Sequence, residues 1–275
     1  MTPASRWITR AQLARDAATI GLAPGDTVMI HASLRAVGKP ILGGADALID
    51  AVFDAIGPAG TMLMYVGCES PFDDVGRAYF SPEEEALFLA ECPPFDPATA
   101  RASREFGALA EIFRSRPGVR CSAHVGARMA AYGPRTDDLL TPASLADGHG
   151  IGSPLERLYA EGKVLLIGSD LDEVTLLHYA EAIAPIADKR VVHVKAPLLV
   201  DGVRTWVEYT EYDSSTGVRE WEERFFAQIM ERFIASGAPR RGRVGDAESY
   251  LFGARELVDF AVPIIVQSAA RLETR

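Results

Sequence analysis

Residues 26–66 read DTVMIHASLRAVGKPILGGADALIDAVFDAIGPAGTMLMYV, and this stretch decides the fold. Its two ends, 26–33 and 60–66, are short apolar runs that predict buried strands. Between them, 44–57 carries apolar residues at helical spacing and closes on a glycine, which predicts a helix. A strand, a helix and a second strand at this spacing are typical of a βαβ unit, in which parallel strands carry helices on their faces.

Helix signals lie on both sides of this unit. Thr9 is expected to cap a first helix that stops at Gly21, and Ser81 to cap a helix whose first-turn glutamates complement its dipole. Further helices are expected over 107–118, 173–184 and 222–237, followed by a C-terminal helical stretch that begins at 247 and bends at Pro263.

Strand signals continue after the βαβ unit. KVLLIGS at 163–169 predicts a buried strand that leads directly into the next helix. The β-prone runs 190–200 and 203–212 flank Asp201-Gly202. Two such runs around Asp-Gly are a strong signal for an antiparallel hairpin.

We therefore expect one α/β domain, residues 1–275, with a central mixed sheet flanked by helices and an antiparallel hairpin. The chain has no internal repeat, low-complexity segment or long linker that would divide it. Its hydrophobic content of 48% is ordinary for a soluble globular protein. Cys68, Cys92 and Cys121 cannot all pair and form no Cys-x-x-Cys motif. That argues against a disulfide framework and a structural zinc site, and it favours a reducing compartment.

The charge balance limits the class of partner. The formal net charge is −10, from 28 basic and 38 acidic residues. It disfavours nucleic acid or an anionic membrane surface and permits a cationic partner, although many soluble proteins are acidic only for solubility. The N-terminus has no apolar signal segment, and no apolar run approaches the roughly 20 residues that span a bilayer. We expect a cytoplasmic protein without a nucleic-acid or membrane partner.

Several common reaction centres have no support in the sequence. The chain lacks His-Glu-x-x-His, and its single His-x-x-Glu pair reverses the order that di-iron bundles use, so we expect no metal. GHGIGS at 148–153 lacks the spacing of a dinucleotide-binding loop. Neither GxxxxGK[ST] nor G-x-S-x-G occurs, so nucleotide-triphosphate chemistry and a serine hydrolase are not indicated.

The segment EVTLLHYAEAIA, 173–184, is an apolar helix with a polar row. Thr175, His178 and Glu181 are three apart and therefore share one face. Such a row is either a hydrogen-bonded feature of the core or the edge of an active site, and the segment alone does not decide between them. In the loop after the first strand, Ser33 and Arg35 offer a hydroxyl and a guanidinium suited to a phosphate-bearing ligand.

Three motifs are specific: HASLRAVG at 31–38, FDPATA at 95–100 and TLLHYAE at 175–181. With GPAGTMLMYVG, GSPLERL, YTEYDS and VGDAESYLFGARELVDFAV they occur in order and cover nearly the whole chain. Together they resemble the aminoglycoside 3-N-acetyltransferase family, the acetyl-CoA-dependent antibiotic-resistance enzymes. The resemblance implies the antibiotic N-acetyltransferase fold rather than the common N-acetyltransferase superfold.

The resemblance also implies the site. The histidine that matches His178 is the family's general base, and Thr175 and Glu181 are then its orienting neighbours. The residues expected to bind acetyl-CoA are Ser33, Leu34, Arg35, Val37, Gly38 and Ser122. The residues expected to bind the aminoglycoside are Tyr65, Glu69, Asp73, Glu211 and Asp213.

Independently of the resemblance, an acidic cleft would attract a polycationic substrate electrostatically. Asp74 is a further candidate for its wall and equally a solvated surface acid. The chain departs from the family at Val125, where proline is common, at Arg128, usually a small residue, and at Cys68, often tryptophan. His124 and Arg128 are either sources of positive charge near the coenzyme or surface and packing residues.

The expected reaction is direct acetyl transfer from acetyl-CoA to the 3-amino group of a 2-deoxystreptamine aminoglycoside, in a ternary complex. His178 accepts the proton of the amine, a role that contributes roughly 10²–10⁴-fold. One alternative is a coenzyme A-dependent N-acyltransferase that acts on another small amine. Another is a catalytically silent protein that sequesters cationic drugs. The protein is expected to be a monomer or a homodimer.

Overall fold

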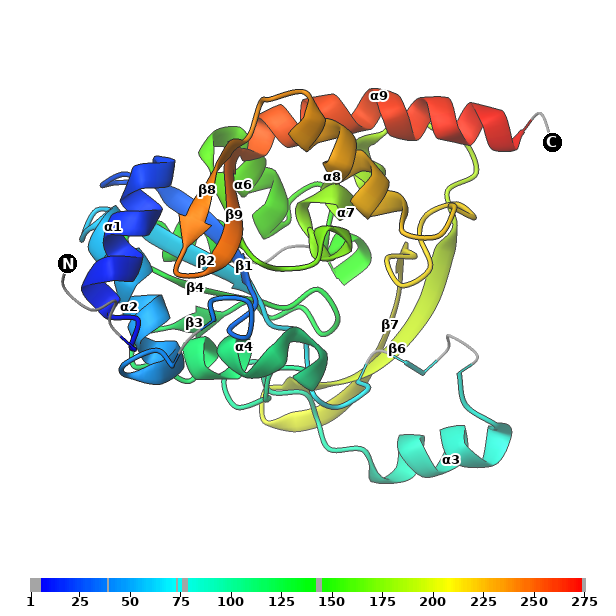
Figure 1. Ribbon diagram of the computed structural model, residues 1–275. Helices are drawn as coiled ribbons and strands as arrows, with labels where there is room; N and C mark the ends of the chain where they lie inside the picture. Colours follow the sequence, from blue (N-terminus) through cyan, green and yellow to red (C-terminus); the bar gives the residue numbers. More distant parts are fainter. Residues whose placement is uncertain (1–5, 39, 73, 76–78, 142–144, 274–275) are drawn as a thin grey trace, which may run out of the picture.

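The computed structural model describes residues 6–38, 40–72, 74–75, 79–141 and 145–273. Within this part of the chain, the centre is a seven-stranded sheet with the strand order β3-β4-β2-β1-β5-β9-β8 (Figure 1). Its strands are β1 (Thr27–Ala32), β2 (Thr61–Tyr65), β3 (Arg120–Cys121), β4 (Met129–Tyr132), β5 (Lys163–Ile167), β8 (Arg240–Val244) and β9 (Ala247–Gly253).

The predicted βαβ unit is confirmed and lies at the middle of the sheet. β1 runs parallel to β2 on one side and to β5 on the other, with Val28 paired to both Met62 and Lys163. The outer strands β4 and β9 run antiparallel to β2 and β5. The sheet is therefore mixed, as expected.

Helices cover both faces of the sheet. The described helices are α1 (Arg10–Ile20), α2 (Gly44–Ile56), α3 (Pro82–Glu91), α4 (Gly107–Arg114), α5 (Thr136–Leu140), α6 (Pro154–Glu161), α7 (Leu176–Ile183), α8 (Phe225–Ala235) and α9 (Ala254–Leu272), and all of them except α3 lie close to the sheet (Figure 1). Val28 and Ile30 of β1 pack with α1, α2 and α4, whereas Met29 packs with α6 to α9. Because β1 is buried on both faces, its central residues 28–30 form a continuous apolar run instead of alternating with polar residues.

The predicted helix caps are confirmed. The Thr9 side chain accepts a hydrogen bond from the Gln12 amide, and Gly21 ends α1 with a φ of 112°. Ser81 and Glu84 form a reciprocal capping box at the start of α3. α3 buries none of its residues and stands apart from the sheet beside the hairpin, so its acidic first turn is solvated (Figure 1).

The hairpin is also confirmed and forms a separate two-stranded sheet of β6 (Val191–Val200) and β7 (Val203–Tyr212). Asp201 and Gly202 both have positive φ, 49° and 78°, which is the requirement of a tight type I′ turn. The hairpin is joined to the segment before α4 through Phe95, whose amide donates to the Pro197 carbonyl at 2.5 Å. It thus forms a long wall beside the central sheet (Figure 1).

One element prediction is wrong. Residues 247–253 form β9 rather than the beginning of a helix, and the basic segment before them forms β8. β9 buries four of its seven residues and pairs with the buried strand β5, so tertiary pairing overrides the local helical pattern. The helix begins only at Ala254, after Gly253, and Pro263 lies inside it.

α9, with 19 residues, is the longest of the described helices. No helix in the described part of the chain combines the length and the apolar character needed to cross a membrane.

Candidate active site

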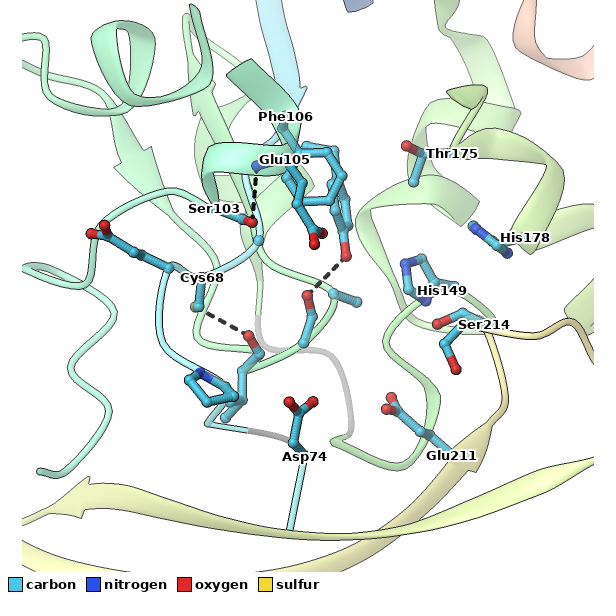
Figure 2. A pocket seen from close by; sticks show the side chains of 18 of the residues that line it. Cys68, Asp74, Ser103, Glu105, Phe106, His149, Thr175, His178, Glu211 and Ser214 are labelled. Carbon is cyan, nitrogen blue, oxygen red and sulfur yellow. Dashed lines mark hydrogen bonds between the residues drawn. The ribbon is translucent and has the colours of Figure 1, made fainter. Parts of the chain in front are cut away.

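A cavity of about 480 Å³ opens at the carboxyl ends of β2 and β5. Its walls come from the loops that follow these two strands, from the β3–β4 connection and from the end of the hairpin (Figure 2). In α/β sheets, ligands bind outside the carboxyl ends of the strands. Of the predicted site residues, Tyr65, Glu69, Thr175, His178 and Glu211 line this cavity.

His178 is held by its neighbour one helical turn further on. Its Nδ1 lies 3.0 Å from Oε2 of Glu181, whose carboxylate is only 1% exposed. A carboxylate accepts a hydrogen bond at this position, so Nδ1 carries the proton and Nε2 presents its lone pair. Nε2 has no hydrogen-bond partner in the described chain, and the ring lines the cavity. The ring is thus arranged to accept a proton.

Aromatic rings fix the plane of the imidazole. Phe226 packs edge-on against His178 with the ring centroids 4.8 Å apart. The ring of His149 lies on the cavity side of His178, with the two ring centroids 5.0 Å apart, and it stacks on Tyr65. Thr175 is buried at the start of α7, and its carbonyl accepts the His178 amide. The predicted Thr175–His178–Glu181 row is therefore at the edge of a cavity rather than inside the core.

The cavity is strongly acidic. Among the described residues that line it there are six carboxylates and neither lysine nor arginine. The six are Glu69, Asp74, Glu105, Asp172, Glu173 and Glu211. Burial, together with the negative charges of Asp170, Asp172 and Glu105, raises the pKa of Glu173. Glu69 is partly neutralised by Arg104, which donates to Oε1 through Nε at 2.7 Å.

The two acids at the hairpin end have different surroundings. Glu211 lines the main cavity and is 5% exposed. Asp213 borders a small recess beside His178 and Glu181, and it accepts hydrogen bonds from the amides and hydroxyls of Ser215 and Thr216. Burial acts to raise the pKa of Asp213, but these hydrogen bonds outweigh it and hold the pKa below its ordinary value. Asp213 thus stabilises its own turn, and its predicted contact with substrate stays a prediction.

A second cavity of about 300 Å³ adjoins the first. The two share Tyr65, Glu105, Phe106, Glu173 and Thr175. Ser33, His31 and Ser169 also line the second cavity. The Nε2 atom of His31 and Oγ of Ser169 are buried and have no hydrogen-bond partner in the described chain. Burial lowers the pKa of His31 to about 4, so its ring is neutral at pH 7.

The structure brings only part of the predicted coenzyme loop to this cavity. Ser33 lines it, and its hydroxyl also accepts the Ala36 amide. Leu34 packs against the hydrophobic core and Val37 lies fully within it, while Gly38 has a φ of 96° and lies against Asp246. Arg35 is exposed at the turn.

Ser122 lies in the β3–β4 hairpin, where its hydroxyl accepts the Met129 amide. It lines neither of the two cavities. Asp73, the remaining predicted substrate residue, lies outside the described residues.

His124 and Arg128 are both buried and bonded to the backbone around them, and neither lines the second cavity. His124 accepts the Ala127 amide at Nδ1, which leaves Nε2–H to donate to the Leu145 carbonyl, so the ring is neutral. Arg128 is fully buried and donates to the carbonyls of Pro97 and Ala100. A buried guanidinium needs such acceptors, and here they attach the FDPATA segment to the sheet.

Other residues of the site were missed by the sequence analysis. His149 lines the cavity and belongs to the GHGIGS segment, whose glycine pattern points only to a nucleotide-binding loop and marks no histidine. Glu105, Asp172 and Glu173 belong to no motif, and nothing in the local sequence marks them as site residues. Trp221 lies 40 positions from Glu181 yet donates a hydrogen bond to it. Only the tertiary fold brings these groups together.

Within the described residues, no three histidine, cysteine or acidic side chains are grouped so that they could hold a metal ion.

Comparison with known proteins places this arrangement in a family. The model of the family described as aminoglycoside 3-N-acetyltransferase matches residues 29–265. Aminoglycoside N(3)-acetyltransferase III of Pseudomonas aeruginosa is 41% identical over 256 residues, which cover 92% of each chain. Aminoglycoside N(3)-acetyltransferase VII of Streptomyces paromomycinus is 39% identical, with 96% of this chain and 93% of the relative covered.

Solved structures agree with the sequence relatives. Aminoglycoside acetyltransferase AAC(3)-Xa superposes with a TM-score of 0.90 at 38% identity, with 96% of this chain and 95% of that chain covered. AAC-IIIb in a binary complex with CoASH gives a TM-score of 0.88 at 37% identity, with 95% and 97% covered. AAC-VIa bound to sisomicin gives 0.86 at 37% identity, with 94% and 97% covered. The resemblance seen in the sequence is thereby confirmed, and the chain belongs to the aminoglycoside 3-N-acetyltransferase family of acyltransferases.

Proposed function

We propose that this protein transfers the acetyl group of acetyl-CoA to the 3-amino group of 2-deoxystreptamine aminoglycosides and thereby confers resistance to them. One observation carries the proposal: the His178–Glu181 pair opens onto a cavity with six carboxylates and, among its described lining residues, no cationic side chain. Family membership supplies the reaction class, and the cavity supplies the chemical class of the acceptor.

The acceptor fits the main cavity through charge. Aminoglycosides carry several ammonium groups, and a concave site lined by one sign of charge attracts and orients a polycation. Glu211 and Asp74 lie on the side of the cavity opposite Glu105 and Phe106 (Figure 2). A relative of this chain is solved with sisomicin, an aminoglycoside, in complex.

His178 prepares the amine. An ammonium group has no lone pair, so it must lose a proton before it can attack the thioester carbonyl. His178 Nε2 accepts this proton, directly or through a water molecule, and Glu181 stabilises the resulting imidazolium through Nδ1–H. As the new C–N bond forms, the C–S bond breaks. The sulfur takes the proton back from the His178 imidazolium and leaves as the coenzyme A thiol, and the second proton of the amine passes to solvent. Because the thioester is already activated, the acetyl group passes directly to the amine in a ternary complex.

The donor fits the adjoining cavity. Its two unpartnered buried atoms, His31 Nε2 and Ser169 Oγ, are suited to a ligand that brings carbonyl or amide groups. Ser33, which lines this cavity, and Arg35, which is exposed two residues further on, would meet phosphate oxygens. A donor bound in the second cavity would reach past Thr175, which lines both cavities, into the main cavity and meet the acceptor there. A relative is solved with CoASH.

The proposal is tested by following thiol release from acetyl-CoA with purified protein. Gentamicin-, kanamycin- and neomycin-type compounds are compared with simple primary amines, and the site of acetylation is determined by NMR. We expect turnover only with the aminoglycosides, modification at the 3-amino group, and rates that fall as salt is added, because salt screens the acidic cavity. Turnover with simple amines and none with aminoglycosides would replace the proposal by a different N-acyltransferase activity. Tight aminoglycoside binding without thiol release would instead indicate a sequestering protein.

A further inference from the structure

We propose that Trp221 is a positioning residue for the catalytic base. Its indole N–H anchors one oxygen of Glu181, so that the other oxygen stays on His178 and holds the ring in the tautomer that accepts a proton. The inference rests on the proposed function, since it concerns the same base.

The hydrogen bonds form a continuous chain from the loop before α8 to the cavity. Trp221 Nε1 donates to Glu181 Oε1 at 2.5 Å, and Glu181 Oε2 lies 3.0 Å from His178 Nδ1. Glu181 is almost completely buried. A buried carboxylate is costly unless both oxygens have partners, and here each oxygen has one.

The indole is itself held in place by the local sequence. It stacks on Phe225 with the ring centroids 4.5 Å apart and an interplanar angle of 17°. Gly217 has a φ of 87°, and a Cβ atom there would lie 2.5 Å from Cδ1 of Trp221. A larger residue at position 217 would therefore be strained and would push the indole away. The glycine and the aromatic stack together fix the N–H donor.

The anchor matters because Glu181 has a competing partner. Lys189 is close enough for the Glu181 charge to act on it, and its ammonium group already donates to the Ala182 carbonyl. A carboxylate free to rotate could turn from His178 toward that cation. The indole, which is neutral and directional, keeps Oε1 occupied and leaves Oε2 for the histidine. His149, Glu211 and Asp213 line the same small recess as the pair.

The direct test is Trp221→Phe, which keeps an aromatic ring on Phe225 and removes only the N–H group. We expect kcat to fall about tenfold or more, as for a lost hydrogen bond to a charged group, with the KM of both substrates within about twofold. In ¹⁵N-histidine NMR of the ligand-free protein at alkaline pH, His178 should change from mainly the Nδ1–H tautomer to a mixture. Trp7→Phe is the matched control, because Trp7 is 41% exposed and lies outside both cavities.

A double-mutant comparison separates positioning from simple destabilisation. In a Glu181→Gln background, Trp221→Phe should lower kcat little further, because the group that it anchors is already changed. A second full loss of kcat in that background, or an unchanged kcat and His178 tautomer in the single variant, would overturn the inference. A raised KM with kcat intact would also overturn it by placing Trp221 in substrate binding. If wild-type protein shows no turnover, the proposed function fails, and the tautomer measurement still tests the role of Trp221.

Discussion

Glu211 and Asp213 lie two residues apart at the end of the hairpin, yet only Glu211 lines the main cavity, whereas Asp213 is hydrogen-bonded to the turn that follows it. The resemblance to the family implied one role for both acids. Because their surroundings differ, we expect substitutions of Glu211 and Asp213 to have different effects.

Glu211→Gln should raise the KM for aminoglycoside about tenfold and leave the KM for acetyl-CoA within about twofold. The substitution removes a negative charge from the cavity in which we propose that the polycation binds, and an ionic hydrogen bond is worth about 1.5–3 kcal/mol. Steady-state kinetics with each substrate varied in turn gives both constants. Equal increases for the two substrates would mean that Glu211 shapes the site without meeting the ammonium groups.

Asp213→Asn should act first on stability. One carboxylate oxygen that now accepts the Thr216 hydroxyl, or the other that accepts from Ser215, becomes an NH₂ donor. Leaving such a buried group mismatched costs about 1–3 kcal/mol, and the KM for aminoglycoside rises as a consequence of the disturbed turn. Urea denaturation measures the stability of wild type and variant, and steady-state kinetics measures their KM for aminoglycoside. A large increase in KM with unchanged stability would show that Asp213 is a direct substrate ligand, as the family resemblance implies.

His178→Ala should remove most turnover, by roughly 10²–10⁴-fold, while coenzyme A binding changes little. The ring packs between Phe226 and His149 and is partly open to the cavity, so we expect the fold to survive its removal. Calorimetric titration with coenzyme A and a thermal melt are the controls. A variant that kept near-wild-type kcat would show that another group is the base.

The sequence was most informative where local patterns and tertiary structure agree. The strands 27–32 and 61–65 and the hairpin turn at Asp201-Gly202 have apolar runs or turn residues that no neighbour overrides. The helix predicted over residues 247–253 is wrong because a short apolar run such as Tyr250-Leu251-Phe252 is compatible with a buried strand as well as with a buried helix. Their pairing with β5, some 80 residues earlier in the chain, decides the outcome.

Long-range packing also limits how much of the candidate site can be predicted from the sequence. The His178–Glu181 contact follows from spacing on one helix and was predictable. Trp221, His149 and Glu105 reach the base or its cavity from three separate loops. Their positions depend on how those loops cross the sheet edge, and no local periodicity encodes this.

Glu111→Gln should destabilise the protein at neutral pH and progressively less in acid. The Arg114 guanidinium, helped by the Ala102 amide, lowers the pKa of Glu111 to about 2 against an ordinary 4.5. Because the pKa of the folded state is the lower one, the stabilisation is complete above about pH 4.5 and is lost as the pH falls toward 2. At about 1.4 kcal/mol per pH unit the upper limit is about 3 kcal/mol, which the 31% exposure of the side chain reduces to about 2.

The measurement is urea denaturation of wild type and variant between pH 7 and pH 3, with Glu220→Gln as the control at an exposed acid. The difference in the free energy of unfolding between wild type and Glu111→Gln should decrease steadily as the pH falls. If this difference stayed constant with pH, the loss of stability would come from packing and not from the ion pair.

Arg35→Ala should lower the affinity for acetyl-CoA by about one to two orders of magnitude. The affinity for a short acetyl thioester, such as that of N-acetylcysteamine, should hardly change. Arg35 is exposed at the turn after β1, next to Ser33 on the second cavity, and its guanidinium makes no hydrogen bond or ion pair with the described residues. It is therefore available for the phosphates, which only the full coenzyme carries, and a charge-assisted bond to phosphate is worth about 1.5–3 kcal/mol. Arg15→Ala, at an exposed arginine on α1, is the matched control for loss of positive charge. An equal loss for the truncated thioester would place Arg35 at the acyl end or in folding, and the coenzyme would then have to enter from another side of the cavity.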